Sequence, residues 1–199
     1  MPDKAERHQQ RMARKKAVID ASIAKSDQDK GLLLVLTGNG KGKSSSAFGM
    51  VARTLGYGYK AGVAQFIKSR RDTGEEKFLG TQPGVEWHVL GDGFTWDTQN
   101  LDADIATARR GWQTAKRMLS DSSLHLVVLD ELTYLLNMGY LDEKQVIADI
   151  AARPGMQHVV ITGRAASAAL LEIADTVSEI RDVKHAFRAG IRAQPGIDL

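Results

Sequence analysis

The fold of this 199-residue chain is decided by one stretch, Leu32-Leu33-Leu34-Val35-Leu36-Thr37-Gly38-Asn39-Gly40-Lys41-Gly42-Lys43-Ser44. Its apolar start predicts a strand, and a helical pattern follows the glycines and runs to Leu55. Gly38, Gly40 and Gly42 permit backbone angles that point successive N–H groups at an anion. Lys43 supplies a cation, and Ser44 supplies a hydroxyl suited to Mg²⁺. The stretch therefore predicts a phosphate-binding loop.

The spacing of this loop departs from the usual motif. The usual first glycine stands five residues before the last one, which is Thr37 here, and the chain has its glycine one residue later. Lys41 adds a second cation to the loop. We expect the residues that contact phosphate to be Gly38, Asn39, Gly40, Lys41, Gly42, Lys43, Ser44 and Ser45.

Short apolar runs alternate with helical patterns along the rest of the chain. The runs predict strands at 32–36, 61–67, 85–90, 124–129, 158–162 and 176–180. Several runs are continuous, which is typical of parallel strands covered on both faces. Apolar residues at helical spacing predict helices over 102–119 and around 146–151. We therefore expect one α/β domain over 31–199, with a mostly parallel six-stranded sheet and helices on both faces.

Two acidic residues, Asp130 and Glu131, follow the run at 126–129. Because the carboxyl ends of parallel strands face the ligand crevice, we expect these acids to lie near the phosphate loop. Together with Ser44 they form the predicted Mg²⁺ site. The alternative is that Asp130 only caps the following helix.

Two arginines extend the predicted phosphate site. Arg164 follows the fifth strand in Ile161-Thr162-Gly163-Arg164, at the same edge of the sheet. A guanidinium group there can bind phosphate through two hydrogen bonds. Arg53 lies on the helix after the loop and has weaker support. For both residues the alternative is an ordinary surface arginine.

Composition narrows the class of protein. With 43% apolar and 26% charged residues the chain is globular, and its lack of cysteine excludes disulfides and thiolate metal sites. The longest apolar run, 32–36, is too short to span a membrane, and the N-terminus has no apolar signal core. We expect a cytoplasmic protein. The histidines at 88, 125 and 158 are predicted strand residues rather than metal ligands, and Trp112 is a predicted core residue.

Residues 1–30 differ in charge from the rest of the chain. They hold eight Lys and Arg against five Asp and Glu, which accounts for the whole net charge of +3. The neutral remainder makes a nucleic-acid surface less expected. We interpret 1–30 as a basic extension that becomes helical against a partner; the alternative is a solvated tail.

A glycine-flanked polar loop, Gly91-Asp92-Gly93-Phe94-Thr95-Trp96-Asp97-Thr98-Gln99-Asn100, follows the third strand. Two large aromatic side chains at this edge either fold into a core or form a stacking wall for a flat ligand. Spacing alone favours the core over the stacking wall.

Several segments together resemble the P-loop corrinoid adenosyltransferases, also called cob(I)alamin adenosyltransferases. These segments are GNGKGKS at 38–44, GFTWDTQN at 93–100, LDELTY at 129–134, ITGR at 161–164 and VKHAFRAGIRAQPGID at 183–198. The resemblance runs in order from about Gly31 to Leu199, and the basic extension is also similar. Ser44-Ser45 departs from the Thr-Thr common in the family, but both hydroxyls are kept.

The resemblance implies a RecA-like domain that works as a homodimer. It implies transfer of the 5′-deoxyadenosyl group of ATP to cobalt(I) of a corrinoid, with release of inorganic triphosphate. Phe94 and Trp96 would lie on the corrin face and exclude an axial ligand from cobalt, and the extension would fold over the corrinoid. Mg²⁺ would be held by Ser44 and Glu131, with Asp130 less certain. A flavodoxin-like protein would supply the electron.

Other activities use the same loop and acids. A RecA-like ATPase that acts on nucleic acid would use Glu131 to polarise water, but it leaves the segment GFTWDTQN unexplained. A small-molecule kinase would transfer the last phosphoryl group of ATP, and a corrinoid carrier would catalyse nothing. The nucleotide product distinguishes these alternatives.

Overall fold

The computed structural model describes residues 3–67, 73–91 and 100–198. The chain divides into two compact units, Met1–Lys30 and Gly31–Leu199. Among the described residues, no helix is both long and apolar enough to cross a membrane.

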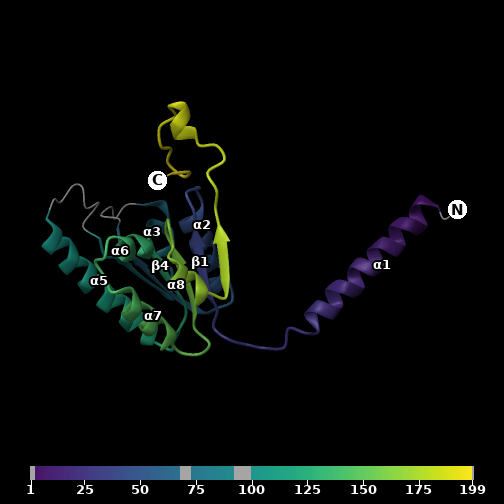
Figure 1. The fold of residues 1–199 in the computed structure, drawn as a ribbon, viewed down its shortest axis with the longest axis horizontal. Helices are drawn as coiled ribbons and strands as arrows, with labels where there is room; N and C mark the ends of the chain where they lie inside the picture. The colour runs from purple at the N-terminus through teal and green to yellow at the C-terminus, as the bar shows by residue number, and fades with distance from the viewer. Residues whose placement is uncertain (1–2, 68–72, 92–99, 199) are drawn as a thin grey trace. The chain divides into compact units, whose positions relative to one another are not determined.

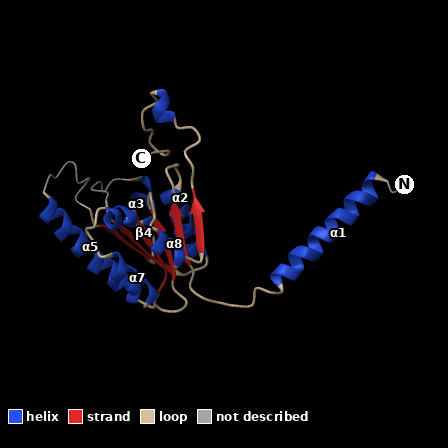
Figure 2. Cartoon of the chain, in the orientation of Figure 1, coloured by secondary structure: helices blue, strands red, loops and turns tan. Residues whose placement is uncertain are grey.

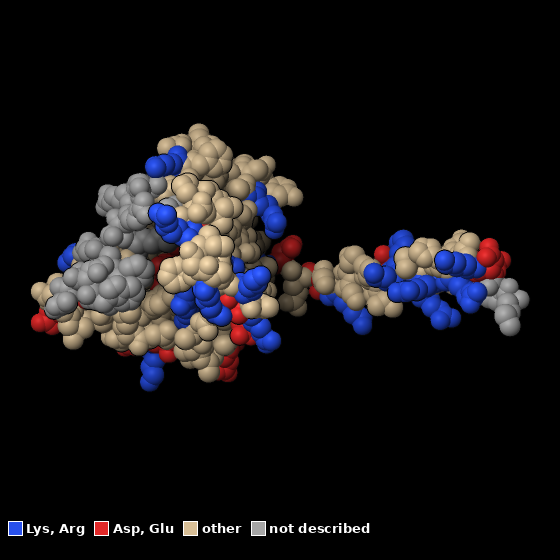
Figure 3. All heavy atoms as spheres, turned by 90° about the horizontal axis from the view of Figure 1, so that it is seen from above, with Lys and Arg blue, Asp and Glu red and all other residues tan. Residues whose placement is uncertain are grey.

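The first unit contains one helix, α1 (Lys4–Ile23). Its N-terminus has a capping box, in which the Asp3 side chain accepts a hydrogen bond from the helix start and Glu6 accepts one from the Asp3 N–H. All described side chains of this unit are exposed. Lys and Arg side chains are distributed along the helix (Figure 3). The extension is therefore helical without any buried face of its own.

The second unit is built on a single sheet (Figures 1 and 2). Its strands run in the order β3-β2-β4-β5-β1-β6, and every neighbouring pair is parallel. The strands are β1 (Leu33–Thr37), β2 (Lys60–Gln65), β3 (Val85–Val89), β4 (Leu124–Asp130), β5 (His158–Thr162) and β6 (Thr176–Glu179). This confirms the predicted α/β class and six-stranded sheet. Because all the strands are parallel, their carboxyl ends meet at one edge.

Helices cover both faces of the sheet. On one face α2 (Lys43–Gly56) and α3 (Gly74–Leu79) pack against the core that contains Val63 and Val128. The other face, with Val127 and Leu129, is covered by four helices. Neighbouring residues of β4 thus enter opposite cores, because successive strand side chains point to opposite faces. The four helices are α5 (Leu101–Ser120), α6 (Leu132–Asn137), α7 (Glu143–Ala151) and α8 (Ala168–Glu172).

Residues outside the predicted site also lie where the sequence indicated. Trp112 is 4% exposed, and its indole Nε1 donates to Asp149 Oδ2 at 2.9 Å, so it is a core residue. His88, His125 and His158 lie in β3, β4 and β5. The short helices α3, α6 and α8 were not predicted, since five or six residues are too few to show a helical period. After β6 the chain contains a 3₁₀ helix, η1 (Ala186–Ala189).

Candidate functional site

The predicted phosphate loop leaves the carboxyl end of β1 and ends where α2 begins. Gly38 has φ 98° and Gly42, the residue before α2, has φ 120°. The Gly40 N–H donates to Ile180 O at 2.7 Å, and a Cβ on Gly40 would lie 2.6 Å from Arg181 O. Gly42 is therefore required for its positive φ, Gly40 for close packing on the chain that leaves β6, and Gly38 for both reasons.

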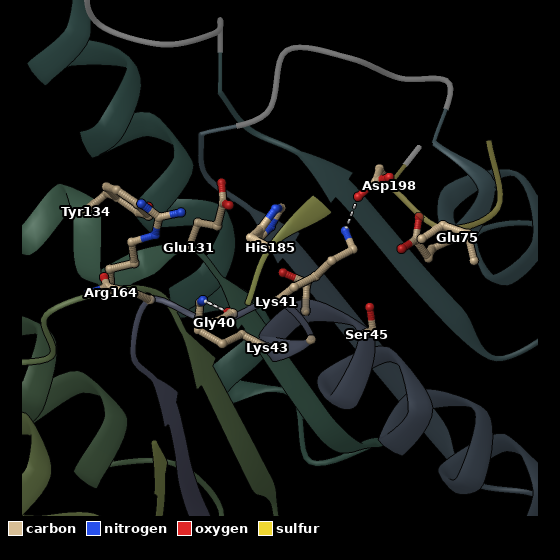
Figure 4. A pocket seen from close by; sticks show the side chains of 14 residues that line it. Gly40, Lys41, Lys43, Ser45, Glu75, Glu131, Tyr134, Arg164, His185 and Asp198 are labelled. Carbon is tan, nitrogen blue, oxygen red and sulfur yellow. Dashed lines mark hydrogen bonds and ion pairs between the residues drawn. The ribbon is translucent and has the colours of Figure 1, made fainter. Parts of the chain in front are cut away.

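A cavity of about 260 Å³ opens beside this loop (Figure 4). It collects residues that the sequence predicted in separate segments: the loop and start of α2, Glu131 after β4, and Arg164 after β5. Gly38 is the one predicted loop residue that lies outside it, beside a neighbouring cavity. The lining residues are Asn39, Gly40, Lys41, Gly42, Lys43, Ser44, Ser45, Glu75, Glu131, Tyr134, Arg164, His185, Ile197 and Asp198.

Lys43 lies at the base of the cavity, where its Nζ donates to Gly40 O at 2.7 Å. Burial lowers the pKa of the Lys43 amine below its usual value, and the positive charge of Arg164 lowers it further. The acids Glu131 and Asp130 act in the opposite direction. Two cations are thus held near each other beside the N-terminus of α2, an arrangement that favours binding of a polyanion.

Lys41 points toward the other side of the cavity (Figure 4). Its Nζ lies 2.7 Å from Asp198 Oδ1, and this bond lowers the pKa of the Asp198 carboxyl. Asp198, Ile197 and His185 belong to the C-terminal segment after β6. The residue patterns predicted none of these three as site residues, because no motif spacing links them to the loop. Only the family-like run at 183–198 pointed to this segment.

The two predicted acids have different environments. Glu131 lines the cavity, and its left-handed backbone, φ 62°, turns the chain sharply between β4 and α6. Asp130 is fully buried, and its two carboxylate oxygens accept hydrogen bonds from Thr162 Oγ1 at 2.7 Å and Gln65 Nε2 at 3.0 Å. It does not line the cavity. The residue at the cap position of α6 is Glu131, so the alternative that Asp130 caps this helix is wrong.

The turn that carries Arg164 is held by α6. Thr133 Oγ1 and Asn137 Nδ2 donate to the Arg164 carbonyl oxygen at 2.8 and 3.2 Å. The preceding Gly163 has φ 144°, and a Cβ there would lie 1.9 Å from Thr133 Oγ1. The guanidinium group of Arg164 therefore reaches the cavity from a turn whose preceding position, 163, accommodates only glycine.

Arg53 does not reach this cavity. It lies in the last turn of α2, about 15 Å along the helix axis from Lys43 at ~1.5 Å per residue. There it lines a separate cavity with Tyr57, Tyr59 and His125 among others. Because α2 runs away from the phosphate loop, the position of Arg53 does not support the predicted phosphate contact.

The predicted corrin-facing residues, Phe94 and Trp96, lie outside the described residues. The described chain ends on either side at Gly91 and Asn100. Asn100 caps α5, since its side chain accepts a hydrogen bond from the Ala103 N–H at 3.1 Å. Gly91 comes shortly after β3, at the same carboxyl edge of the sheet as the cavity.

The oxygen donors of the cavity fit Mg²⁺. A nucleotide-bound Mg²⁺ takes one or two protein oxygens and completes its octahedral shell with phosphate oxygens and water. Ser44 and Glu131 both line the cavity and offer such oxygens. Asp130 is less suited, because it is buried behind the cavity in bonds to other side chains. Among the described residues no group of three or more His, Asp or Glu is arranged to hold a metal without a substrate.

An all-parallel α/β sheet with a phosphate loop at its carboxyl edge defines a P-loop nucleotide-binding protein. Comparison with known proteins narrows this class. Residues 29–199 match the family model described as ATP:corrinoid adenosyltransferase BtuR/CobO/CobP, and residues 1–23 match the model described as cob(I)alamin adenosyltransferase N terminal. The chain belongs to the corrinoid adenosyltransferase family, whose enzymes transfer an adenosyl group from ATP to a corrinoid.

Named relatives agree with this family along nearly the whole chain. A corrinoid adenosyltransferase of Pseudomonas aeruginosa is 57% identical over 199 residues, which cover 100% of this chain and 98% of that protein. A corrinoid adenosyltransferase of Escherichia coli K12 is 52% identical, and the corrinoid adenosyltransferase CobA of Salmonella typhimurium is 51% identical. Each of these two alignments covers 193 residues, 97% of this chain and 98% of the relative. The resemblance inferred from the sequence is confirmed.

The close approach at Gly163 predicts a selective effect of an added methyl group. We expect Gly163→Ala to lower the free energy of unfolding by more than about 2 kcal/mol, because strain at positive φ and the contact with Thr133 add together. Gly139→Ala is the matched control, since Gly139 has φ 69° but a Cβ there meets nothing within 4 Å. Denaturant unfolding measures the free energy of unfolding of both variants. An equal loss of stability in the two variants would contradict a special constraint at the turn that carries Arg164.

The environment of Lys43 predicts how ATP binding responds to pH. The protonated amine attracts phosphate, so ATP affinity should fall as the pH rises through the lowered pKa of Lys43. Arg164→Gln removes a repelling cation, raises this pKa and shifts the fall to higher pH. Titration calorimetry from pH 7.5 to 10.5 measures the shift. Arg53→Gln, in the separate cavity, should leave the profile unchanged; a profile that shifts equally in both variants would contradict the assignment.

Proposed function

We propose that this chain transfers the 5′-deoxyadenosyl group of ATP to cobalt(I) of cobalamin or a related corrinoid and releases inorganic triphosphate. The observation that carries the proposal is the group of cations, Lys41, Lys43 and Arg164, around one cavity at the phosphate loop. Attack at the ribose C5′ makes the whole triphosphate the leaving group. A site for this reaction must therefore stabilise charge over three phosphates rather than activate water at the last one.

The bond changes of this reaction are simple. Cobalt(I) of the substrate donates its electron pair to C5′, the cobalt–carbon bond forms and the bond from C5′ to the phosphate oxygen breaks. That electron pair leaves with the triphosphate, and cobalt becomes formally cobalt(III). Because the corrinoid is itself the nucleophile, the protein must align the two substrates and exclude water.

The phosphate loop and several residues that line the cavity have proposed tasks. Loop N–H groups between Gly38 and Ser44 bind the triphosphate together with Lys41, Lys43 and Arg164; the Gly40 N–H is not among them, because it donates to Ile180 O. Ser45 adds a second hydroxyl at the start of α2. Ser44 and Glu131 hold Mg²⁺, which neutralises phosphate charge when bound. Lys41 exchanges its ion pair with Asp198 for a phosphate contact, and partial exposure of both side chains makes this exchange inexpensive.

The proposed binding of the corrinoid rests on the family resemblance. We place Phe94 and Trp96 on the corrin face and the helical extension over the corrinoid, in a homodimer supplied with electrons by a flavodoxin-like protein in the cytoplasm. The extension exposes apolar side chains, Met12, Val18, Ile19 and Ile23, on a helix with no buried face. Such a helix is suited to bind against another surface.

Product analysis tests the proposed reaction. Incubation with Mg-ATP and cob(I)alamin should yield equal amounts of triphosphate and a light-sensitive adenosylcorrinoid. Lys43→Ala should lower kcat/KM about 100-fold or more, as loss of a charge-stabilising group does, while Arg53→Ala should retain activity. Formation of ADP that is stimulated by DNA or RNA would instead indicate an ATPase. A phosphorylated acceptor would indicate a kinase, and unchanged ATP would indicate a corrinoid carrier.

The aromatic pair predicts a dependence on the reductant. If Phe94 and Trp96 exclude an axial donor that stabilises cobalt(II), the double variant Phe94→Ala, Trp96→Ala should react slowly with a weak protein reductant. With cobalt already reduced chemically, the same variant should approach the wild-type rate. Wild-type rates under both conditions would contradict a role in cobalt reduction.

A further inference from the structure

A buried chain of polar side chains crosses four neighbouring strands behind the nucleotide cavity. Trp87 Nε1 on β3 donates to Gln65 Oε1 on β2 at 3.0 Å, and Gln65 Nε2 donates to Asp130 Oδ2 on β4 at 3.0 Å. From the other side, Thr162 Oγ1 on β5 donates to Asp130 Oδ1 at 2.7 Å. Thr162 Oγ1 in turn accepts the Glu131 N–H at 2.9 Å. Gln65, Asp130 and Thr162 are each no more than 1% exposed.

Two groups that can only donate determine the direction of every bond in this chain. The Trp87 indole must donate, so Gln65 turns its oxygen toward Trp87 and its amide nitrogen toward Asp130. The Glu131 N–H must also donate, so the Thr162 hydroxyl accepts there and directs its own hydrogen to Asp130. Asp130 therefore accepts from both sides, which suits a carboxylate and no neutral amide of the same shape.

The end of this chain meets a strained residue of the site. Glu131 has a left-handed backbone, which is costly for a residue with a Cβ and persists where surrounding contacts hold it. The contact that holds its N–H is Thr162 Oγ1. Thr162 also stands two residues before Arg164. Its buried hydroxyl therefore lies between the turn that carries Glu131 and the turn that carries Arg164.

We propose that Thr162 and Asp130 are positioning residues, which hold the Glu131 backbone in the conformation that directs its carboxylate at the magnesium-bound triphosphate. The two acids after β4 then have different tasks. Glu131 contacts the substrate complex, whereas Asp130 anchors the turn from behind and binds no metal. This inference rests on the proposed Mg-nucleotide site and adds to it how that site is kept in shape.

Isosteric substitutions test the positioning role. Thr162→Val keeps the shape and removes the hydroxyl, and we expect it to raise the Mg²⁺ concentration for half-maximal ATP binding about tenfold, since the Glu131 N–H loses its buried acceptor. Thr162→Ser keeps the hydroxyl and should stay within about twofold of wild type. Asp130→Asn should resemble Thr162→Val, because its NH₂ group would face a donor. Titration calorimetry of ATP at graded Mg²⁺ measures all three.

A double-mutant cycle separates positioning from general loss of stability. If Thr162 acts through Glu131, Thr162→Val should change the Mg²⁺ requirement by less than about twofold in a Glu131→Gln background. An equal effect in both backgrounds would overturn the proposal. Trp112→Phe is the stability control, since it removes a partly buried hydrogen bond to Asp149 without touching the chain behind the cavity. A tenfold change in the Mg²⁺ requirement of this variant would also overturn the proposal.

Failure of this inference differs from failure of the proposed function. If wild-type protein forms adenosylcorrinoid but Thr162→Val and Thr162→Ser bind Mg-ATP alike, only the positioning role is wrong. If wild-type protein forms no adenosylcorrinoid, the proposed reaction is wrong, and the Mg²⁺ dependence of ATP binding still decides the role of Thr162. Thermal unfolding shows that each variant is folded before it is compared.

Discussion

Parallel pairing of β5 with both β1 and β4 is the constraint on which the site depends. The phosphate loop follows β1, Glu131 follows β4 and Arg164 follows β5. Because the three strands run in the same direction and lie side by side, groups far apart in the chain reach one edge of the sheet. An antiparallel neighbour would send one of these turns to the opposite edge and remove its charge from the cavity.

The cavity balances opposing electrostatic requirements. Cations are needed to bind a triphosphate, yet partial burial and mutual repulsion both disfavour the charged form of Lys43. The negative charges of Glu131 and Asp130 offset part of this effect on Lys43. Glu131 lines the cavity, and Asp130 is buried behind it. These acidic residues at a cationic site thus oppose the lowering of the Lys43 pKa.

The C-terminal segment is part of the site in a way that the phosphate-loop motif does not suggest. Ile180 accepts the Gly40 N–H, and Asp198 forms an ion pair with Lys41. The loop is therefore supported on one side by the chain that leaves β6. This packing explains why glycine is needed at 38 and 40, where any side chain would strike the backbone of 180–181.

Local patterns in the sequence predicted the strands, the helices α2 and α5, the phosphate loop and the family, because hydrophobic period and motif spacing are properties of neighbouring residues. Position along the chain also suggested Glu131 and Arg164, since Glu131 directly follows β4 and Arg164 comes two residues after the end of β5. The three-dimensional arrangement was needed to show that Asp130 bonds to Thr162 and Gln65 instead of lining the cavity, that Arg53 lines a separate cavity, and that Asp198 meets Lys41. Those outcomes depend on the direction of helices and on hydrogen-bond partners from distant strands, which no local pattern encodes.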